Sequence, residues 1–186
     1  MPAKRKGRPA SPRLSRQRIL ATALVLYRKL GVERTSLRAL AAALRVDPMA
    51  LYHYFPGKQQ LLVAALELAF ERLPAEMPPH FTGKKAVTFL LTEYLTLAAR
   101  NRTLTLYLIT RQDAMPRNLD HFNALLLAAL GAVAPDAATG RRLRDILIDY
   151  AHGYLIATEH FTGEQRRRAV HEFSLSVSLI LQAAAP

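Results

Sequence analysis

Two tyrosines and a histidine are consecutive in this chain, at Tyr52, His53 and Tyr54. Phenol and imidazole groups stack and exchange hydrogen bonds, so three of them together suit noncovalent recognition. Lys58 follows at the expected start of a helix, where its charge and the helix dipole would both attract an anion such as phosphate. The stretch from Thr35 to Lys58 therefore indicates a binding site.

The helix that carries these rings is expected to have one apolar side and one outward side. Asp47 can cap its N-terminus, and Pro48 suits its first position. Leu51 and Phe55 lie one helical turn apart and predict the side that contacts a core. The outward side carries Met49, Ala50, Tyr52, His53 and Tyr54. This side is aromatic and uncharged, which is unusual for a surface that meets only water.

Two earlier segments must hold this helix in place. The first is preceded by Ser15, a residue that caps helices well, and its apolar residues keep helical spacing up to Gly31. A left-handed C-cap glycine is expected at that point. The second segment starts at Thr35 and Ser36 and lasts for about two to three turns. The order helix, helix, short turn, helix is what a helix-turn-helix requires.

Positive charge is concentrated near the N-terminus. Of the 26 Lys and Arg and 14 Asp and Glu in the chain, residues 1–72 hold 14 and 4, a net charge of +10. Residues 73–186 hold the remaining 12 and 10, a net charge of +2. Such an asymmetry predicts a polyanionic partner for the first part alone, although a solubilising tail would look the same. Residues 1–15 have three prolines and no acid, so a flexible basic arm is expected.

Residues 18–66 resemble the DNA-binding domain of the TetR family of bacterial transcriptional regulators. The segments that carry the resemblance are RILATALVLYRKLG, TSLRALAAAL and VDPMALYHYFPGKQQLL. The resemblance covers about a quarter of the chain, and the remainder resembles the family only in being helical. A three-helix bundle without a DNA role would have similar spacing, but the charge and the aromatic side weigh against it. One departure is Arg45, in the turn, where many members of the family have glycine. If this position requires a left-handed backbone conformation, arginine adopts it at a higher free-energy cost than glycine.

The resemblance implies roles for individual side chains. Thr35 and Ser36 would contact backbone oxygens of DNA, and Arg38 would reach a base edge. Tyr52 and Tyr54 would lie against phosphates and bases. The expected DNA-binding residues are Thr35, Ser36, Arg38, Pro48, Met49, Ala50, Tyr52, His53, Tyr54 and Lys58.

The predicted fold is all-α, with about nine helices. Residues 1–15 are expected to form the arm and residues 16–73 the helix-turn-helix domain, with its motif at about 36–55. Residues 74–186 are expected to form a C-terminal effector-binding and dimerisation domain. Residues 103–109 alternate with the period of a strand, but no partner strand is predicted elsewhere, so a helix is expected there.

The resemblance further implies a homodimer in which two helices of each subunit meet. The segments 141–160 and 164–184 are the candidates. Two recognition helices about 34–36 Å apart would read a palindrome that one helix could not read. The residues expected in the interface are Leu143, Ile146, Leu147, Phe173, Val177, Ile180 and Leu181. The alternative is that residues 173–181 pack inside one subunit.

A pocket for a small apolar or amphipathic effector is also implied by the resemblance. Its expected walls are aromatic rings with polar tips, although each ring alone would equally suit an ordinary core. These residues are Tyr94, Tyr107, His121, Phe122, Tyr150 and Tyr154. No metal or cofactor is expected, because His121, His152 and His160 lack the spacing and nearby carboxylates of a metal site.

The sequence thus predicts a homodimeric, ligand-responsive transcriptional regulator, in the first place a repressor, that binds double-stranded DNA in the cytoplasm. A ligand-independent DNA-binding or architectural protein would share the N-terminal part but lack a cavity. An enzyme is not indicated, since no nucleophile with an ordered base, phosphate-binding glycine loop or paired carboxylates is found. The chain has no cysteine, and no apolar run approaches the roughly 18–20 residues that span a bilayer.

Overall fold

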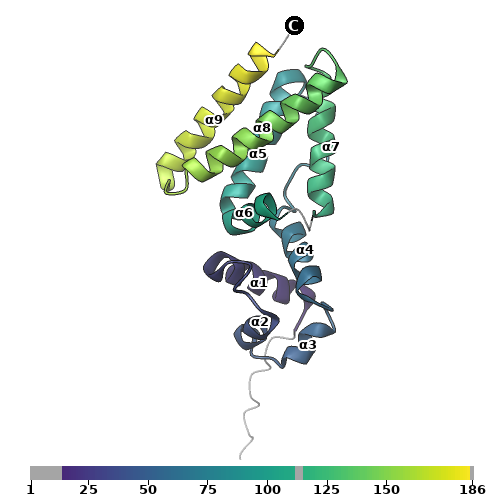
Figure 1. Ribbon diagram of the computed structural model, residues 1–186, viewed down its shortest axis with the longest axis vertical. Coiled ribbons are helices and arrows are strands. Elements are labelled where there is room, and N and C mark those ends of the chain that lie inside the picture. Colours follow the sequence, from purple (N-terminus) through teal and green to yellow (C-terminus); the bar gives the residue numbers. More distant parts are fainter. Residues whose placement is uncertain (1–13, 112–114, 185–186) are drawn as a thin grey trace, which may run out of the picture.

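The computed structural model describes residues 14–111 and 115–184, and every regular element in these ranges is a helix (Figure 1). The helices are α1 (Arg16–Leu30), α2 (Leu37–Leu44), α3 (Pro48–Tyr52), α4 (Lys58–Ala69), α5 (Gly83–Arg100), α6 (Arg102–Thr110), α7 (Arg117–Gly131), α8 (Ala137–Ala157) and α9 (Gly163–Ala183). The all-α prediction is confirmed, and the segment 103–109 is helical as expected. Most of the predicted basic arm, residues 1–13, lies outside the described residues.

Helix α1 begins and ends where its capping residues require. The Ser15 side chain accepts a hydrogen bond from the Arg18 amide at 3.2 Å, and Gly31 follows the last turn with φ of 85°. Between them Ile19, Ala23 and Tyr27 recur every fourth residue and are fully buried. Local sequence signals are therefore sufficient to define this helix.

Helices α2 and α3 form the predicted helix-turn-helix. The Ser36 hydroxyl caps α2 by accepting from the Ala39 amide at 3.1 Å. The Asp47 carboxylate caps α3 by accepting from the Met49 amide at 2.7 Å, and Pro48 is the first residue of that helix. Because α3 has only five residues, its orientation depends on how its apolar side is buried more than on helical propensity.

The turn between these helices contains a left-handed residue that is not glycine. Arg45 has φ of 58° and ψ of 46°, and it is the only non-glycine residue with positive φ in the described ranges. Its amide donates to the Ala41 and Ala42 carbonyls, which closes the C-terminus of α2. The left-handed conformation expected from the sequence is therefore present.

Helix α4 connects the helix-turn-helix to a bundle of the remaining helices. Figure 1 shows α1, α2 and α3 at one end of the molecule and α8 and α9 side by side at the other. In the bundle α5 contacts α7, α8 and α9, so it is the central helix. One apolar cluster of buried residues extends from α1 through α4 and α5 to α9. A shift of α4 therefore cannot occur without repacking on both sides.

Arg45→Gly is expected to stabilise the chain. Glycine would remove roughly 1–2 kcal/mol of left-handed strain, and this exceeds its extra backbone entropy, so the free energy of unfolding should rise by about 0.5–1 kcal/mol. Urea unfolding followed by circular dichroism measures the change. The matched control is Ala43→Gly, an exposed helical position in α2, which should lower stability by about 0.5–1 kcal/mol. A loss of stability in Arg45→Gly would contradict the strain at this turn.

Candidate functional site

The first candidate site is the outward side of α3 and the neighbouring start of α2. Leu51 and Phe55 are buried at 0% and 1% exposure and hold α3 against the core. Met49 and Tyr52 on the other side are 66% and 45% exposed, and His53 is exposed as well. The uncharged side predicted for this helix is thus presented to the outside at the far end of the molecule from α8 and α9 (Figure 1).

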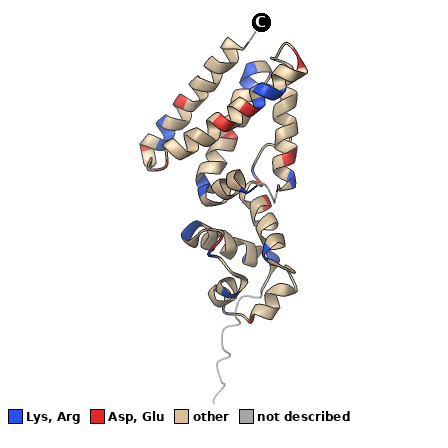
Figure 2. Ribbon diagram, in the orientation of Figure 1, with Lys and Arg blue, Asp and Glu red and all other residues tan. Residues whose placement is uncertain are grey.

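Basic side chains border this surface. Arg38 is exposed on the first turn of α2, and Arg45 is exposed in the turn. Lys58 is half-buried at the start of α4, where its ammonium group donates to the Glu33 carbonyl at 3.1 Å. The N-cap residue of α4 is Gly57, which supplies no side-chain cap, and the dipole of the helix favours an anion at this end. Figure 2 shows the Lys and Arg positions of these helices with few acidic residues beside them.

Thr35 is a correction to the predicted DNA-binding set. Its side chain is only 2% exposed, and its hydroxyl donates to the Gly31 carbonyl at 2.8 Å. A buried hydroxyl with a partner cannot contact an external phosphate without breaking the turn that follows α1. Ser36, in contrast, is exposed. Thr35 and Ser36 are both residue types that cap helices, so the sequence did not predict which of the two side chains would be exposed.

Tyr54 differs from the two rings before it. It is half-buried, and its hydroxyl donates to the Leu14 carbonyl at 3.0 Å. The Arg16 guanidinium lies 4.5 Å from the centroid of the Phe55 ring, and it donates a hydrogen bond to the Tyr54 carbonyl at 3.5 Å. These contacts connect the start of α1 to the end of α3. Pro48 and Ala50 are also half-buried, so the most exposed members of the predicted set are Ser36, Arg38, Met49, Tyr52 and His53.

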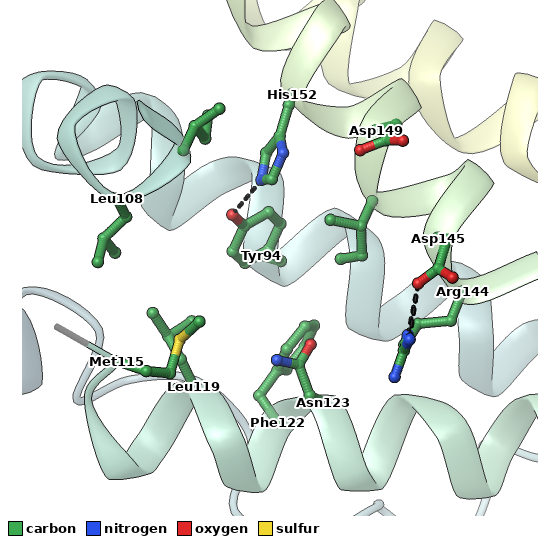
Figure 3. A pocket seen from close by; sticks show the side chains of 12 residues that line it. Tyr94, Leu108, Met115, Leu119, Phe122, Asn123, Arg144, Asp145, Asp149 and His152 are labelled. Carbon is green, nitrogen blue, oxygen red and sulfur yellow. Dashed lines mark hydrogen bonds and ion pairs between the residues drawn. The ribbon is translucent and has the colours of Figure 1, made fainter. Parts of the chain in front are cut away.

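The second candidate site is a cavity of about 480 Å³ between α5, α6, α7 and α8 (Figure 3). Its size is in the range of small-molecule pockets, which is about 300–1,000 Å³. The Tyr94 and Phe122 rings stack with centroids 5.5 Å apart and form part of its wall. The other lining residues are Leu108, Ile109, Met115, Leu119, Asn123, Arg144, Asp145, Ile148, Asp149 and His152.

A polar pair of one buried and one half-buried residue lies in this wall. The Tyr94 hydroxyl and His152 Nε2 are 2.7 Å apart. Burial raises the pKa of Tyr94, so its phenol stays protonated. Burial also lowers the pKa of His152, although the carboxylate of Asp149 opposes this effect. The imidazole is therefore neutral at pH 7, and the pair presents polar groups without a charge.

Four of the six predicted pocket residues do not line this cavity. His121 points to the loop after α4, where its Nε2 is 2.6 Å from the Ala75 carbonyl. Tyr150 stacks on Phe173 with centroids 5.3 Å apart, and the Tyr154 hydroxyl donates to an α9 carbonyl at 2.8 Å. Tyr107 packs against the shared core. Only Tyr94 and Phe122 of the set belong to the cavity, because helical spacing does not reveal which neighbour a ring meets.

The polar side of the cavity contains carboxylates that were not predicted. It comes from α8, where Asp145, Asp149 and His152 recur at intervals of four and three residues and so lie on one side of the helix. This interval was the available signal. It resembles an ordinary solvated face until the neighbouring helices are in place.

The predicted dimer interface also requires correction. Leu143, Leu147, Phe173, Val177 and Leu181 are at most 6% exposed within the single chain, so they form its core, which is the alternative reading of residues 173–181. Ile180 is half-buried, and Ile146 is 54% exposed. The large apolar side chains that α8 and α9 leave exposed are Ile146, Ile156, Leu175 and Leu179.

Helix α4 is bonded to the bundle by two asparagines. Asn101 is 4% exposed; its amide nitrogen donates to the Ala69 carbonyl at 2.9 Å, and its oxygen accepts from Arg28 at 3.1 Å. Asn118, near the start of α7, donates to the Glu67 carbonyl at 3.0 Å. The next residue, Leu119, lines the cavity. The end of α4 and the cavity wall are thus held by adjacent residues of α7.

These features define an all-helical protein with a helix-turn-helix at one end and a ligand-sized cavity in the bundle. Residues 19–65 match the model of the bacterial regulatory proteins, tetR family. The transcriptional repressor KstR of Rhodococcus jostii is 36% identical over 92 residues, which cover 48% of this chain and 43% of that protein. KstR of Mycolicibacterium smegmatis is 44% identical over 61 residues, or 33% of this chain and 30% of that protein. The matches thus span less than half the length of these relatives.

Solved structures share the fold over nearly the whole chain. The crystal structure of Mycobacterium smegmatis BioQ has a TM-score of 0.74 at 18% identity and covers 93% of this chain and 98% of that one. The structure of BioQ with its double-stranded DNA operator has a TM-score of 0.67 at 20% identity, covering 93% and 99%. The tetR family model thus accounts for residues 19–65, and the solved structures show that the fold is shared over nearly the whole chain. The relatives of this chain are regulators and not enzymes, and none of its described helices could cross a membrane.

Lowering the pH should destabilise the chain partly through His152. Its pKa is depressed in the folded state, so as the pH falls below about 6.5 the unfolded chain takes up the proton first. Stability that is present above that pH is therefore lost as the pH falls through the folded pKa. His152→Gln should reduce the loss of unfolding free energy between about pH 7.5 and 5.5, measured by urea unfolding.

The control for this measurement is His160→Gln, an exposed position outside the cavity. It should keep the pH dependence of the parent chain. Equal pH dependence in the parent and in His152→Gln would refute a neutral, half-buried imidazole at this position.

Proposed function

We propose that this protein is a homodimeric transcriptional repressor that binds a palindromic operator and is released from it by a small-molecule effector. The observation that carries the proposal is the exposed, uncharged side of α3, held rigidly by Leu51 and Phe55 within a segment that matches the TetR DNA-binding domain. The KstR relatives are repressors, and BioQ has been crystallised with its operator. The protein would act on DNA in the cytoplasm.

The proposed division of labour follows the charge and the packing. Residues 1–15 would attract DNA as a basic arm, residues 16–73 would form the DNA-binding domain, and residues 74–186 would bind the effector and the second subunit. In the DNA-binding domain, Met49, Tyr52 and His53 would face the major groove, which is about 12 Å wide. Arg38 would reach a base edge from α2. Sequence reading would then come from side chains on two helices.

Lys58 would contact phosphate and not bases. In the free protein its ammonium group is satisfied by the Glu33 carbonyl, an exposed contact that a phosphate oxygen can replace. The dipole at the start of α4 would attract the same phosphate. Because phosphates carry no sequence information directly, this contact would fix the position of the domain on any DNA.

The second subunit would pack against the outer side of α8 and α9. Leu175 and Leu179 lie one turn apart on α9 and are 52% and 67% exposed, and Ile146 on α8 is 54% exposed. Large apolar side chains gathered on two adjacent helices favour a protein partner over water. A symmetric pair of subunits would place two α3 helices on successive major grooves, about 34–36 Å apart.

Release by the effector would act through α7. Leu119 and Phe122 of this helix line the cavity. Asn118, the residue before Leu119, donates a hydrogen bond to the Glu67 carbonyl of α4. A ligand that separates α7 from α8 would also strain the bond to α4 and change the angle of the DNA-binding domain. The effector lowers operator affinity only if it binds the two arrangements unequally. The presence of a ligand-sized cavity supports a ligand-responsive regulator over a ligand-independent DNA-binding protein.

The DNA-binding proposal predicts different effects for two substitutions. Arg38→Ala should weaken operator binding by about 1–3 kcal/mol while leaving nonspecific binding nearly unchanged, since it removes a base contact. Lys58→Ala should weaken binding to all sequences alike and make the dependence on salt shallower, since it removes a phosphate contact. Gel-shift titrations with the DNA upstream of the gene and with a scrambled duplex, at several salt concentrations, measure both effects.

Two outcomes of these titrations would count against the proposal. If the unmodified protein showed no specific, salt-sensitive binding to any segment of that DNA, the repressor function would be wrong. If Lys58→Ala reduced binding to the operator alone, its assignment to phosphate would be wrong while the rest remained.

The dimer proposal predicts that Leu179→Glu gives a folded monomer. The side chain is 67% exposed in the single chain, so the charge costs little in the monomer but would be buried without a partner in the dimer. Sedimentation or light scattering should show half the mass of the parent protein. Val25→Glu, at an exposed apolar position on α1, is the matched control and should remain dimeric. A dimeric Leu179→Glu would place the interface elsewhere.

A further inference from the structure

The two ends of the cavity differ in chemistry. Figure 3 shows Leu108, Met115 and Leu119 together at one end, from α6 and α7 and the residues before α7. Arg144 and Asp145 of α8 lie at the other end, with Asp149 and His152 along the same helix. The stacked rings of Tyr94 and Phe122 lie between the ends. A molecule that fills the cavity must therefore have an apolar body and one polar end.

The charges at the polar end do not cancel. Arg144 donates from Nε and Nη2 to one Asp145 oxygen, at 2.9 and 2.7 Å, so these two side chains neutralise each other. Asp149 has no hydrogen bond or ion pair with any other described residue. His152 is bonded to Tyr94 and adds no charge. Among the described residues of the lining, Asp149 therefore carries the one uncompensated carboxylate.

This balance discriminates between ligand classes. A carboxylate or phosphate would meet the Asp149 charge. It would find Arg144, the cation among the lining residues that the structure describes, already bonded to Asp145. A neutral alcohol could hydrogen-bond but would leave the charge unpaired. An ammonium group would pair with Asp149 and donate further hydrogen bonds to the polar wall. Only the cationic head satisfies every group that the polar end presents.

We infer that the cavity binds an amphipathic amine, with its apolar body between α6 and α7 and its ammonium group at Asp149 on α8. This inference rests on the proposed function in taking the cavity as the effector site. It narrows the effector from apolar or amphipathic molecules in general to cationic ones. Asp149 lies at the exposed rim of the cavity, so water screens the pair and the preference is about fivefold, not several hundredfold.

Three probes with one apolar body test the inference. Naphthylbutylamine, naphthylbutanol and naphthylbutyrate differ only in the charge of the head group. The chain has no tryptophan, so naphthyl fluorescence can be followed without that background. The amine should bind about fivefold more tightly than the alcohol and more tightly still than the carboxylate. Asp149→Asn should bring the amine to within about twofold of the alcohol while leaving the affinity for the alcohol unchanged.

A matched control separates the pocket from the general charge of the protein. Asp120→Asn removes the same charge from an exposed position on α7 that does not line the cavity, and it should keep the full preference for the amine. Circular dichroism of all three proteins checks that they are folded. Equal binding of the three probes, tighter binding of the carboxylate, no binding of the amine, or a preference that survives Asp149→Asn would each overturn the inference.

Operator release is measured separately, so that the two proposals can fail separately. The amine is titrated into the complex of the protein with its operator, and the released DNA is followed by fluorescence anisotropy. If the amine binds with the expected preference but does not release DNA, the ligand class stands and its role as an effector is wrong. If the alcohol or the carboxylate binds better and releases DNA, the effector function stands and the cationic class is wrong.

Discussion

The buried amide of Asn101 is the contact on which the arrangement of the two ends of the molecule depends. It donates to the carbonyls of Ala69 on α4 and Leu97 on α5 and accepts from Arg28 on α1. A side chain that is 4% exposed can satisfy these groups only while the three helices keep their positions. Leaving such a group without partners costs about 1–3 kcal/mol, so α1 and α4 cannot rotate away from the bundle freely. The helix-turn-helix end is therefore held at a defined angle, as the proposed palindromic operator would require.

The exposed side of α3 depends on a similar constraint at the other end. A helix of five residues is not stable by itself, so its orientation comes from Leu51 and Phe55 in the core and from the left-handed Arg45 before it. The Arg16 guanidinium above the Phe55 ring adds a contact from α1. These residues allow Met49 and Tyr52 to remain outside, where apolar and aromatic groups would otherwise tend to be buried.

The sequence predicted most where the determining interactions are local. Ser15, Gly31 and Asp47 act within one turn of their own helix, so their positions gave the bounds of α1 and the start of α3, and the strand-like segment 103–109 was correctly predicted as a helix. The errors concern partners that lie far away in the chain. The stripe of Phe173 and Val177 correctly indicates a buried side of α9, but periodicity is the same whether the covering surface belongs to the same chain or to a second one. The rings of Tyr150 and Tyr154 were misplaced for the same reason, since α9 lies over the side of α8 that carries them.

Helix α8 shows how the proposed activities would be linked physically. Its buried side, with Leu143 and Leu147, belongs to the core, and its polar side, with Asp149 and His152, lines the cavity. Ile146 lies on neither side and is exposed, so the same helix would meet the ligand and the second subunit. A helix is rigid over its length, and a ligand that moved α8 would also move the proposed dimer contact. In a symmetric dimer that movement would occur in both subunits, and both displacements would contribute to the change in distance between the two α3 helices. A small displacement at the cavity would then be sufficient to lose the register with two successive major grooves.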